Sequence, residues 1–253
     1  MDEAAIELLN KINQLNYEAY IVGGYPRDKY LNIYTTDIDI CTNMKYEDLK
    51  KYFDVKERGY GSCILNYNGY SYDVTTYRKD TEYINHRSPK IEYVDTLEED
   101  LKRRDFIINT LCIDKCGKYV DILGAKNDLD NKIIRCVISD DKKIEEDALR
   151  IMRAIRLATV LNFELSPSLK EAIVKNKHLL KDLSYFRKRE ELDKIFDSNN
   201  KEIGIDLIKE LKLDIELELD FSFVDYTKDK YGIWKSLDYT KYPFSKEELK
   251  RLI

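Results

Sequence analysis

The chain of 253 residues carries 43 Lys or Arg and 48 Asp or Glu side chains, so its net charge is −5 and 36% of its residues are charged. A hydrophobic content of 43% with only 9 Gly and 4 Pro is typical of a packed globular protein and excludes low-complexity and collagen-like chains. No apolar run approaches the roughly 18 residues of a transmembrane span, and the acidic amino terminus is unlike a secretory signal. We therefore expect neither a membrane span nor export.

The cysteines and histidines indicate neither a disulfide framework nor a zinc site. The five cysteines are odd in number and form no C-x-x-C pair, and His86 and His178 are the only histidines. We expect buried thiols in a reducing cytoplasm, with a lone reactive cysteine as the alternative. A mildly acidic chain can still bind nucleic acid, because affinity for phosphates depends on local Lys and Arg clusters.

The first 137 residues alternate between helical and strand patterns. A helix is predicted over 4–15, followed by a strand over 20–22 that stops at Gly23-Gly24. Pro26 then opens a short helix, since proline suits a first helical turn. Further strands are predicted over 37–41, 61–67, 70–77 and 106–113, with helical or polar segments over 46–53 and 97–103. This alternation predicts an α+β head with a mixed sheet over 1–137.

The pattern becomes helical from about Glu145. Helices are predicted over 146–161, 169–175, 187–196 and 202–211, the second with Ser166 as its N-cap. Ser245 and Glu248 have capping-box spacing, so a last helix begins there; either it is short or the chain is truncated. We expect an all-helical second half, with a neck over 138–196 and a body over 197–253.

Two aspartates alternate with two isoleucines over residues 36–40. On a strand, Asp37 and Asp39 would share one face, and the isoleucines between and after them would share the other. Adjacent carboxylates repel unless a cation neutralises them, and oxygen ligands suit Mg²⁺. Asp73 repeats the pattern on another predicted strand, and three carboxylates can hold two metal ions for phosphoryl transfer. The alternative is the solvated face of an edge strand.

Gly23-Gly24 lies between a strand and a helix start, where backbone N–H groups can receive a triphosphate. A glycine pair alone is usually just a turn. A glycine pair, then D-x-D, then a third strand carboxylate is a more specific order, and it is similar to the layout of template-independent nucleotidyltransferases.

Four successive motifs resemble those of the class II CCA-adding enzymes, which are tRNA nucleotidyltransferases, and of their bacterial poly(A) polymerase relatives. In chain order they read IVGGYPRD at 21–28 with the D-x-D that follows, YDVTTYR at 72–78, RRDFIIN at 103–109 and EDALRIMRAIR at 146–156. The resemblance runs from about residue 18 to residue 196. One departure is Phe186, which stands where the family usually has a glutamate.

The resemblance implies a set of site residues in the head. Asp37 and Asp39 would hold two Mg²⁺ ions, with Asp73 as a third catalytic carboxylate, and ATP and CTP would be the substrates. Asp105 would accept hydrogen bonds from the ribose hydroxyls, a bond that charge strengthens. The other residues that we assign to nucleotide binding here are Gly23, Gly24, Arg27, Arg104 and Asn109. The alternative for the charges of 97–105 is mutual balance on the surface.

The fourth motif suggests how a base could be read without a template. Asp147 and Arg150, three residues apart, offer a carboxylate acceptor beside a planar guanidinium donor, and such a pair can read a base edge. Arg153 and Arg156 extend the predicted nucleotide-binding set. The alternative is a surface ladder of ion pairs on one helix, in which Glu146 pairs with Arg150.

A basic cluster over 170–189 is the candidate RNA contact, with seven Lys or Arg side chains against two acidic ones. Its place after the head favours the acceptor stem of tRNA as the partner, with Lys177, Lys181, Arg187 and Lys188 as contacts. A solvated helix face explains the cluster about as well.

These residues predict a cytoplasmic enzyme that adds CMP and AMP to the 3′ end of tRNA. The alternatives are a poly(A) polymerase, an A-only or CC-only enzyme of the same family and, remotely, a non-catalytic RNA-binding protein. A polar connector over 79–92 is similar in length to the flexible loop of full CCA-adding members, which weakly favours A addition. The sequence leaves the oligomeric state open.

Overall fold

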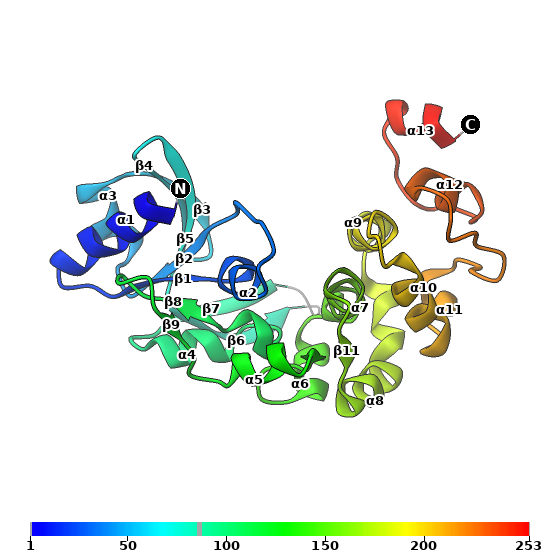
Figure 1. Cartoon of the computed structure of the whole chain (residues 1–253), viewed down its shortest axis with the longest axis horizontal. Coiled ribbons are helices and arrows are strands. Elements are labelled where there is room, and N and C mark those ends of the chain that lie inside the picture. Colours follow the sequence, from blue (N-terminus) through cyan, green and yellow to red (C-terminus); the bar gives the residue numbers. More distant parts are fainter. Residues whose placement is uncertain (1, 85–87, 253) are drawn as a thin grey trace. The chain divides into compact units, whose positions relative to one another are not determined.

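The computed structural model describes residues 2–84 and 88–252. The chain divides into two compact units, a first unit that ends at Asn131 and a second unit that begins at Lys132 (Figure 1). No helix in these described ranges is long and apolar enough to cross a bilayer.

The first unit is built on a seven-stranded mixed sheet with the order β3-β4-β5-β2-β1-β8-β9. Strands β2 (Asp39–Thr42) and β5 (Tyr70–Thr76) run parallel, and the other neighbours are antiparallel. The remaining strands are β1 (Ala19–Val22), β3 (Asp54–Gly59), β4 (Ser62–Tyr67), β8 (Cys112–Ile113) and β9 (Tyr119–Val120). The strands predicted over 20–22, 61–67 and 70–77 are confirmed, whereas the one predicted over 37–41 begins only at Asp39.

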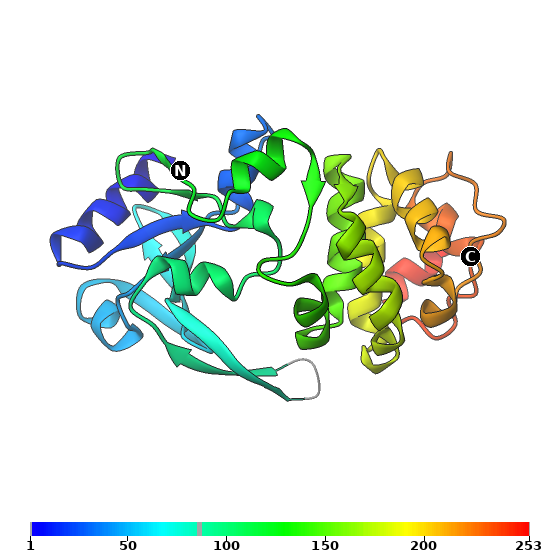
Figure 2. The same cartoon turned by 90° about the horizontal axis from the view of Figure 1, so that it is seen from below.

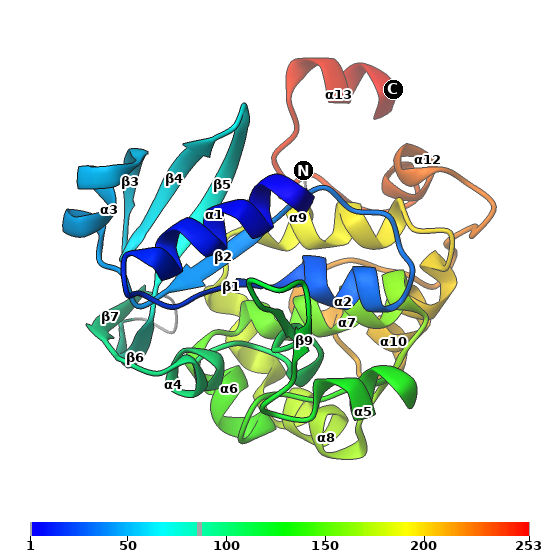
Figure 3. The ribbon, with the colours of Figure 1, turned by 60° about the vertical axis from the view of Figure 1, so that its left-hand side comes forward.

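Helices cover both faces of this sheet. α1 (Asp2–Gln14) packs Leu8 against the face that carries Ile40 (Figure 3), and α4 (Leu97–Lys102) packs Leu101 against the face that carries Cys41. The unit also contains α2 (Gly24–Tyr30), α3 (Tyr46–Tyr52) and α5 (Ala125–Asp130). Successive residues of β2 therefore point into two different cores.

Two segments of the first unit differ from prediction. The connector over 79–92 forms an antiparallel ribbon of β6 (Arg78–Ile84) and β7 (Ser88–Tyr93), and His86 lies outside the described residues. The strand predicted over 106–113 is mostly wrong, because Ile107–Asn109 forms the 3₁₀ helix η1. Asp105 Oδ1 accepts a hydrogen bond from the Phe106 N–H at 2.8 Å, and such local bonds compete with strand pairing.

Within residues 132–252, the second unit is helical apart from one short parallel pair, β10 (Ile133–Ile134) with β11 (Glu164–Leu165) (Figure 2, green to red). Its helices are α6 (Asp140–Glu146), α7 (Leu149–Leu161), α8 (Pro167–Asn176), η2 (Lys177–Asp182), α9 (Tyr185–Phe196), α10 (Lys201–Glu210), α11 (Asp214–Leu217), α12 (Lys230–Lys235) and α13 (Lys246–Leu252). The helices predicted over 169–175, 187–196 and 202–211 are confirmed.

The helix predicted over 146–161 is interrupted near its start. α6 ends at Glu146 and α7 begins at Leu149. Between them Asp147 has an extended backbone (φ −147°, ψ 105°), and its carboxylate accepts a hydrogen bond from the Leu149 N–H at 3.0 Å. Aspartate favours such bonds over a helix interior.

Close packing and capping organise the second unit. A Cβ atom on Gly204 of α10 would lie 2.6 Å from Ile195 Cγ2 of α9, so this glycine allows the two helices to approach. Ser166 caps α8 by accepting a bond from the Leu169 N–H. The predicted capping box is confirmed, since Ser245 N–H donates to Glu248 Oε2 and Glu248 N–H donates to Ser245 Oγ.

All five cysteines are free thiols. Four are buried, as predicted, and Cys116 is exposed. The mixed-sheet head followed by helices is the fold class that the sequence predicts, with the small β10–β11 pair as the one addition in the described part of the second unit.

Candidate active site

The D-x-D segment places its side chains on opposite sides of the sheet. Ile38 and Ile40 are buried in the core beneath α1, Asp39 is half-buried at the start of β2, and Asp37 is exposed just before the strand. Burial alternates along 37–40 as predicted, but only Asp39 of the two aspartates lies on the strand. This alternation directs the two carboxylates away from the apolar core.

Asp39 lies between two residues of neighbouring strands. It pairs in register with Val22 of β1 and with Asp73 of β5. Gly23 follows directly after β1 with φ +79°, and a Cβ atom there would lie 2.8 Å from Asp39 Oδ2. Glycine is needed here for two reasons: it tolerates the positive φ, and it has no Cβ atom that would collide with the carboxylate.

The electrostatic environment of Asp39 disfavours its charged form. Burial raises the pKa of Asp39 to about 6, and the neighbouring charges of Asp37 and Asp73 contribute, while Arg104 opposes the shift. No residue of the described ranges donates a hydrogen bond to the carboxylates of Asp37 or Asp39. Crowded carboxylates without donors fit a bound divalent cation, which would favour their charged form.

The third carboxylate is engaged by a cation of the chain itself. Arg58 Nη1 of β3 lies 2.6 Å from Asp73 Oδ1, and both side chains are about half exposed. Across the described ranges, no three acidic, thiol or imidazole side chains converge closely enough to hold a metal. Asp73 is thus paired with Arg58, on the side of β5 away from Asp39.

The charges of 97–105 balance on the surface only in part, through the exposed pair of Lys102 with Glu98 at 2.6 Å. Asp100 is fully buried and accepts hydrogen bonds from Arg103 at 2.9 Å and Arg104 at 3.0 Å. Burial alone would raise the pKa of Asp100, but the two guanidinium groups lower it below its usual value. The backbone N–H of Arg78 also donates to Asp100. This carboxylate orients Arg104, whose charge reaches Asp39.

A chain of hydrogen bonds links three predicted nucleotide-binding residues. Arg27 Nη1 donates to Asn109 Oδ1 at 2.6 Å, and Asn109 Nδ2 donates to Asp105 Oδ1 at 3.0 Å. Arg27 also pairs with Asp28 at 2.7 Å. A Cβ atom on Gly24 would lie 3.3 Å from Arg27 Nη2. The structure therefore connects Gly24, Arg27, Asn109 and Asp105 within the first unit.

The predicted base-reading residues lie in the second unit. Arg150 is buried, and its Nη1 donates to Glu146 Oε2 and to the Lys143 carbonyl, each at 2.6 Å. The ion pair of Glu146 with Arg150 that the alternative predicts is therefore present, but at Arg150 it is buried and not exposed. Asp147 lies outside both helices, so the two residues are not on one helix as predicted, although both flank the break between α6 and α7.

The other two arginines of this motif lie on α7. Arg156 Nε donates to Glu191 Oε2 of α9 at 2.5 Å, which makes it part of the packing between these helices. Arg153 is half-buried one helical turn after Arg150.

Most of the basic cluster over 170–189 has partners within the second unit. Lys177 donates to the carbonyls of Leu211 and Lys212 at 3.3 Å, and Lys181 pairs with Glu216 at 3.3 Å. Lys188 is 2% exposed, and burial lowers its pKa. Its Nζ donates to the Glu216 carbonyl at 3.3 Å inside the unit, so Lys188 is removed from the predicted contacts.

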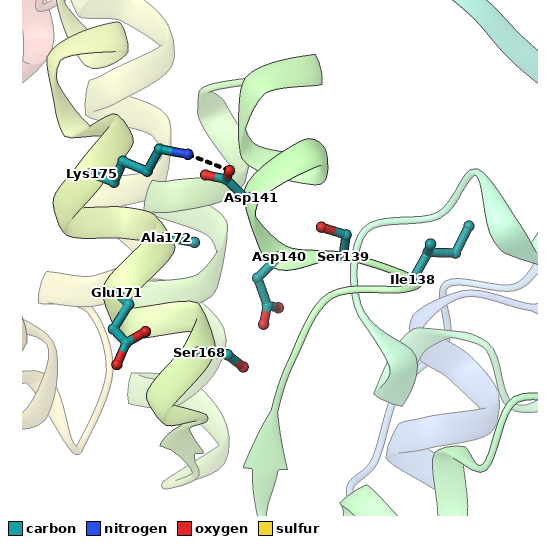
Figure 4. A pocket seen from close by; sticks show the side chains of 8 residues that line it. All are labelled: Ile138, Ser139, Asp140, Asp141, Ser168, Glu171, Ala172 and Lys175. Carbon is teal, nitrogen blue, oxygen red and sulfur yellow. Dashed lines mark hydrogen bonds and ion pairs between the residues drawn. The ribbon is translucent and has the colours of Figure 1, made fainter.

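A pocket of about 470 Å³ in the second unit holds none of the predicted site residues. Asp140, Asp141, Glu171 and Lys175 line it together with four smaller or apolar residues, and Lys175 pairs with Asp141 at 2.5 Å (Figure 4). The excess of carboxylates makes the pocket unsuitable for phosphates.

Sequence reasoning missed Arg58 and Asp100. Asp100 could have been found, because it lies three and four residues before Arg103 and Arg104 on a predicted helix. Arg58 gives no such local signal, because a whole strand separates it from Asp73.

Comparisons with known proteins bear on both units. The family model of the poly(A) polymerase head domain matches residues 19–135. A second model, a probable RNA- and SrmB-binding site of polymerase A, matches residues 162–214.

Characterised relatives match over most of the chain. It is 36% identical over 249 residues to the CCA-adding enzyme of Ligilactobacillus salivarius, which covers 96% of this chain and 60% of that protein. It is 35% identical over 218 residues to the CCA-adding enzyme of Bacillus subtilis, which covers 84% of this chain and 55% of that protein. The chain thus spans a little over half the length of these relatives.

Solved structures match the fold. The CCA-adding enzyme of Bacillus stearothermophilus in complex with CTP superposes with a TM-score of 0.79 at 34% identity, over 85% of this chain and 53% of that one. A tRNA nucleotidyltransferase in complex with a primer tRNA and an incoming ATP analogue gives a TM-score of 0.74 at 25% identity, over 96% of this chain and 78% of that one.

Proposed function

The chain belongs to the family of class II CCA-adding enzymes and poly(A) polymerases, and on this premise we propose that it adds CMP and AMP to the 3′ end of tRNA without a template. The observation that carries the proposal is the cluster at the start of β2. Asp37 and Asp39 precede and begin that strand, Asp73 stands opposite Asp39, and Gly23 faces the Asp39 carboxylate.

Asp37 and Asp39 are the residues that would hold Mg²⁺. Bound there, the metal supplies activation of the 3′-hydroxyl and neutralisation of the leaving pyrophosphate. The contribution of the chain is to hold both carboxylates at the start of β2, an inner strand of the sheet, because Ile38 and Ile40 anchor the segment in the core. Such preorganisation avoids rearrangement during the reaction.

Arg104 and the linked residues Arg27, Asn109 and Asp105 form the proposed nucleotide-binding group of the head. Arg104 is held by the buried Asp100 and supplies positive charge for the triphosphate. Asp105, fixed by Asn109 and by the Phe106 N–H, accepts hydrogen bonds from the ribose hydroxyls. A nucleotide that lacks these hydroxyls would leave this carboxylate unpaired, which favours ribonucleotides.

Asp147 and Arg150 are the proposed readers of the base. Cytosine and adenine both present an amino donor beside a ring-nitrogen acceptor, whereas uracil and guanine present the reverse. A carboxylate and a guanidinium therefore suit C and A and reject U and G through unpaired polar groups. The ion pair with Glu146 at 2.6 Å holds the guanidinium of Arg150 in place.

Lys177, Lys181 and Arg187 remain the proposed contacts to the tRNA backbone. The match of residues 162–214 to an RNA-binding model supports this assignment, and phosphate contacts of Lys and Arg supply most sequence-independent affinity.

The test is to incubate the purified chain with tRNAs that end before CCA, after C and after CC, each with one nucleotide at a time and Mg²⁺. Addition of C, C and then A in that order supports the proposal. Long A tracts on any RNA would instead identify a poly(A) polymerase, and no addition to any of the three tRNAs would overturn it.

A further inference from the structure

The ion pair between Arg58 and Asp73 spans a whole strand. Arg58 lies on β3 and Asp73 on β5, with β4 between them. Strands in a sheet are about 4.8 Å apart, so the pair bridges roughly 10 Å of sheet. An arginine that reaches this far along a surface is extended across β4 toward the carboxylate.

A β-bulge determines which way Arg58 points. The register of β3 and β4 shifts between Glu57 and Gly59, so that Arg58 is the extra residue. Glu57 pairs with Cys63, which faces the core under α1, while Arg58 points to the other face, the face of Asp73. Bulges often re-aim a side chain beside a functional site.

Hydrogen bonds connect the turn after Arg58 to a neighbouring segment of the same chain. Gly59, Tyr60 and Gly61 all have positive φ values. Arg78 donates to the Tyr60 carbonyl, and the Thr76 N–H donates to the Gly61 carbonyl at 2.8 Å. These bonds tie the turn after Arg58 to the end of β5, the strand that carries Asp73, and to the start of β6.

We propose that Arg58 is a positioning residue that holds the Asp73 carboxylate in the substrate-free protein and competes for it with a divalent cation. This inference rests on the proposed function, because it takes Asp73 as the third carboxylate of the metal site. Asp39 and Asp73 are paired in register, so a cation at Asp39 and the guanidinium of Arg58 approach Asp73 from opposite sides. Arg58 contacts only Oδ1 of Asp73, and the repulsion between the two positive charges weakens the hold of each on this carboxylate.

The alternative is a plain surface ion pair that affects only stability. Both side chains are about half exposed, and such pairs are weak. A weak hold is what competition with a metal requires, since a cation must be able to displace it. The two readings differ in their effect on metal binding.

The experiment measures Mn²⁺ binding to the full chain without nucleotide, by the loss of the free-ion signal in electron paramagnetic resonance. The variants are Arg58→Gln, Arg58→Lys, Asp73→Asn and the double variant Arg58→Gln/Asp73→Asn. Lys56→Gln is the matched control, because Lys56 is an exposed cation two residues earlier on the same strand. Asp39→Asn reports whether the metal binds at the proposed site.

We expect Arg58→Gln to tighten Mn²⁺ binding about two- to fivefold at low salt, the range that corresponds to a half-exposed ion pair. Arg58→Lys and Lys56→Gln should change it less, and the gain should vanish in the Asp73→Asn background. Equal gains from Arg58→Gln and Lys56→Gln, no gain, or a gain that persists without Asp73 would overturn the inference. If Asp39→Asn leaves the affinity for Mn²⁺ unchanged, the result would instead contradict the proposed function.

Discussion

Gly23 and Asp39 meet so closely that a side chain at position 23 would force the Asp39 carboxylate or the backbone to move. A Cβ atom there would lie 2.8 Å from Asp39 Oδ2, and the backbone of Gly23 has φ +79°. The glycine turn and the D-x-D segment are therefore one structural unit, although the sequence separates them.

Gly23→Ala should abolish most activity by displacing the Asp39 carboxylate. A displacement of about 1 Å in a site can lower a rate about 100-fold. Gly117→Ala is the matched control, because Gly117 has a similar φ of +75° with nothing within 4 Å of its added Cβ. Both variants should lose about 1 kcal/mol of stability from backbone strain. Nucleotide addition to tRNA measures the difference, and equal activity losses would contradict the contact.

Asp39→Asn should stabilise the metal-free protein at pH 8 but not at pH 4. The pKa of Asp39 is raised from 3.8 to about 6, so its contribution to stability is full below pH 4 and is lost as the pH rises through about 6. Asparagine does not titrate, and the variant should gain about 1 to 3 kcal/mol at pH 8. Thermal melts in a chelator at both pH values measure this. An equal shift in melting temperature at the two pH values would contradict it.

Lys181→Gln with Arg187→Gln should weaken tRNA binding equally for all tRNA sequences and flatten its salt dependence by about one to two units of slope. Lys177 is left in place because it donates to the carbonyls of Leu211 and Lys212, directly after α10. Lys235→Gln, an exposed charge on α12, serves as the control. Filter binding across salt concentrations tests this. If the slope of log affinity against log salt concentration is unchanged, the cluster is a solvated helix face and does not contact tRNA.

Asp147→Asn with Arg150→Lys should relax the choice of nucleotide. Loss of the carboxylate and of the planar guanidinium should raise the use of U and G relative to C and A by about 10- to 100-fold. Conservative variants are needed because Arg150 is buried against Glu146. Lys142→Gln, exposed on α6, is the control. Wild-type selectivity in the double variant would place base reading elsewhere.

Local patterns predict much of this molecule, and long-range contacts account for what they miss. The alternation of Asp37 and Asp39 with isoleucines determines which side chains leave the core, and Ser166 and Ser245 mark helix starts through local bonds. The Arg58–Asp73 pair depends on a bulge and on strand order, which no local pattern specifies.

The break at Asp147 was missed for a different reason. Its carboxylate binds the Leu149 N–H, and this bond outweighs a helical pattern that otherwise continues through the motif. Likewise the charge of Lys188 suggested a surface position, but packing buries it.

The most direct test of the account is single-turnover addition of CMP to a tRNA that ends before CCA, with Mg²⁺, by the native chain and by Asp37→Asn and Asp39→Asn. Asp95→Asn, an exposed aspartate elsewhere in the first unit, controls for the loss of a charge. The account predicts addition by the native chain and the control, and a loss of more than about 100-fold in both D-x-D variants with the fold retained. Addition within about tenfold of the native rate in both variants would contradict it.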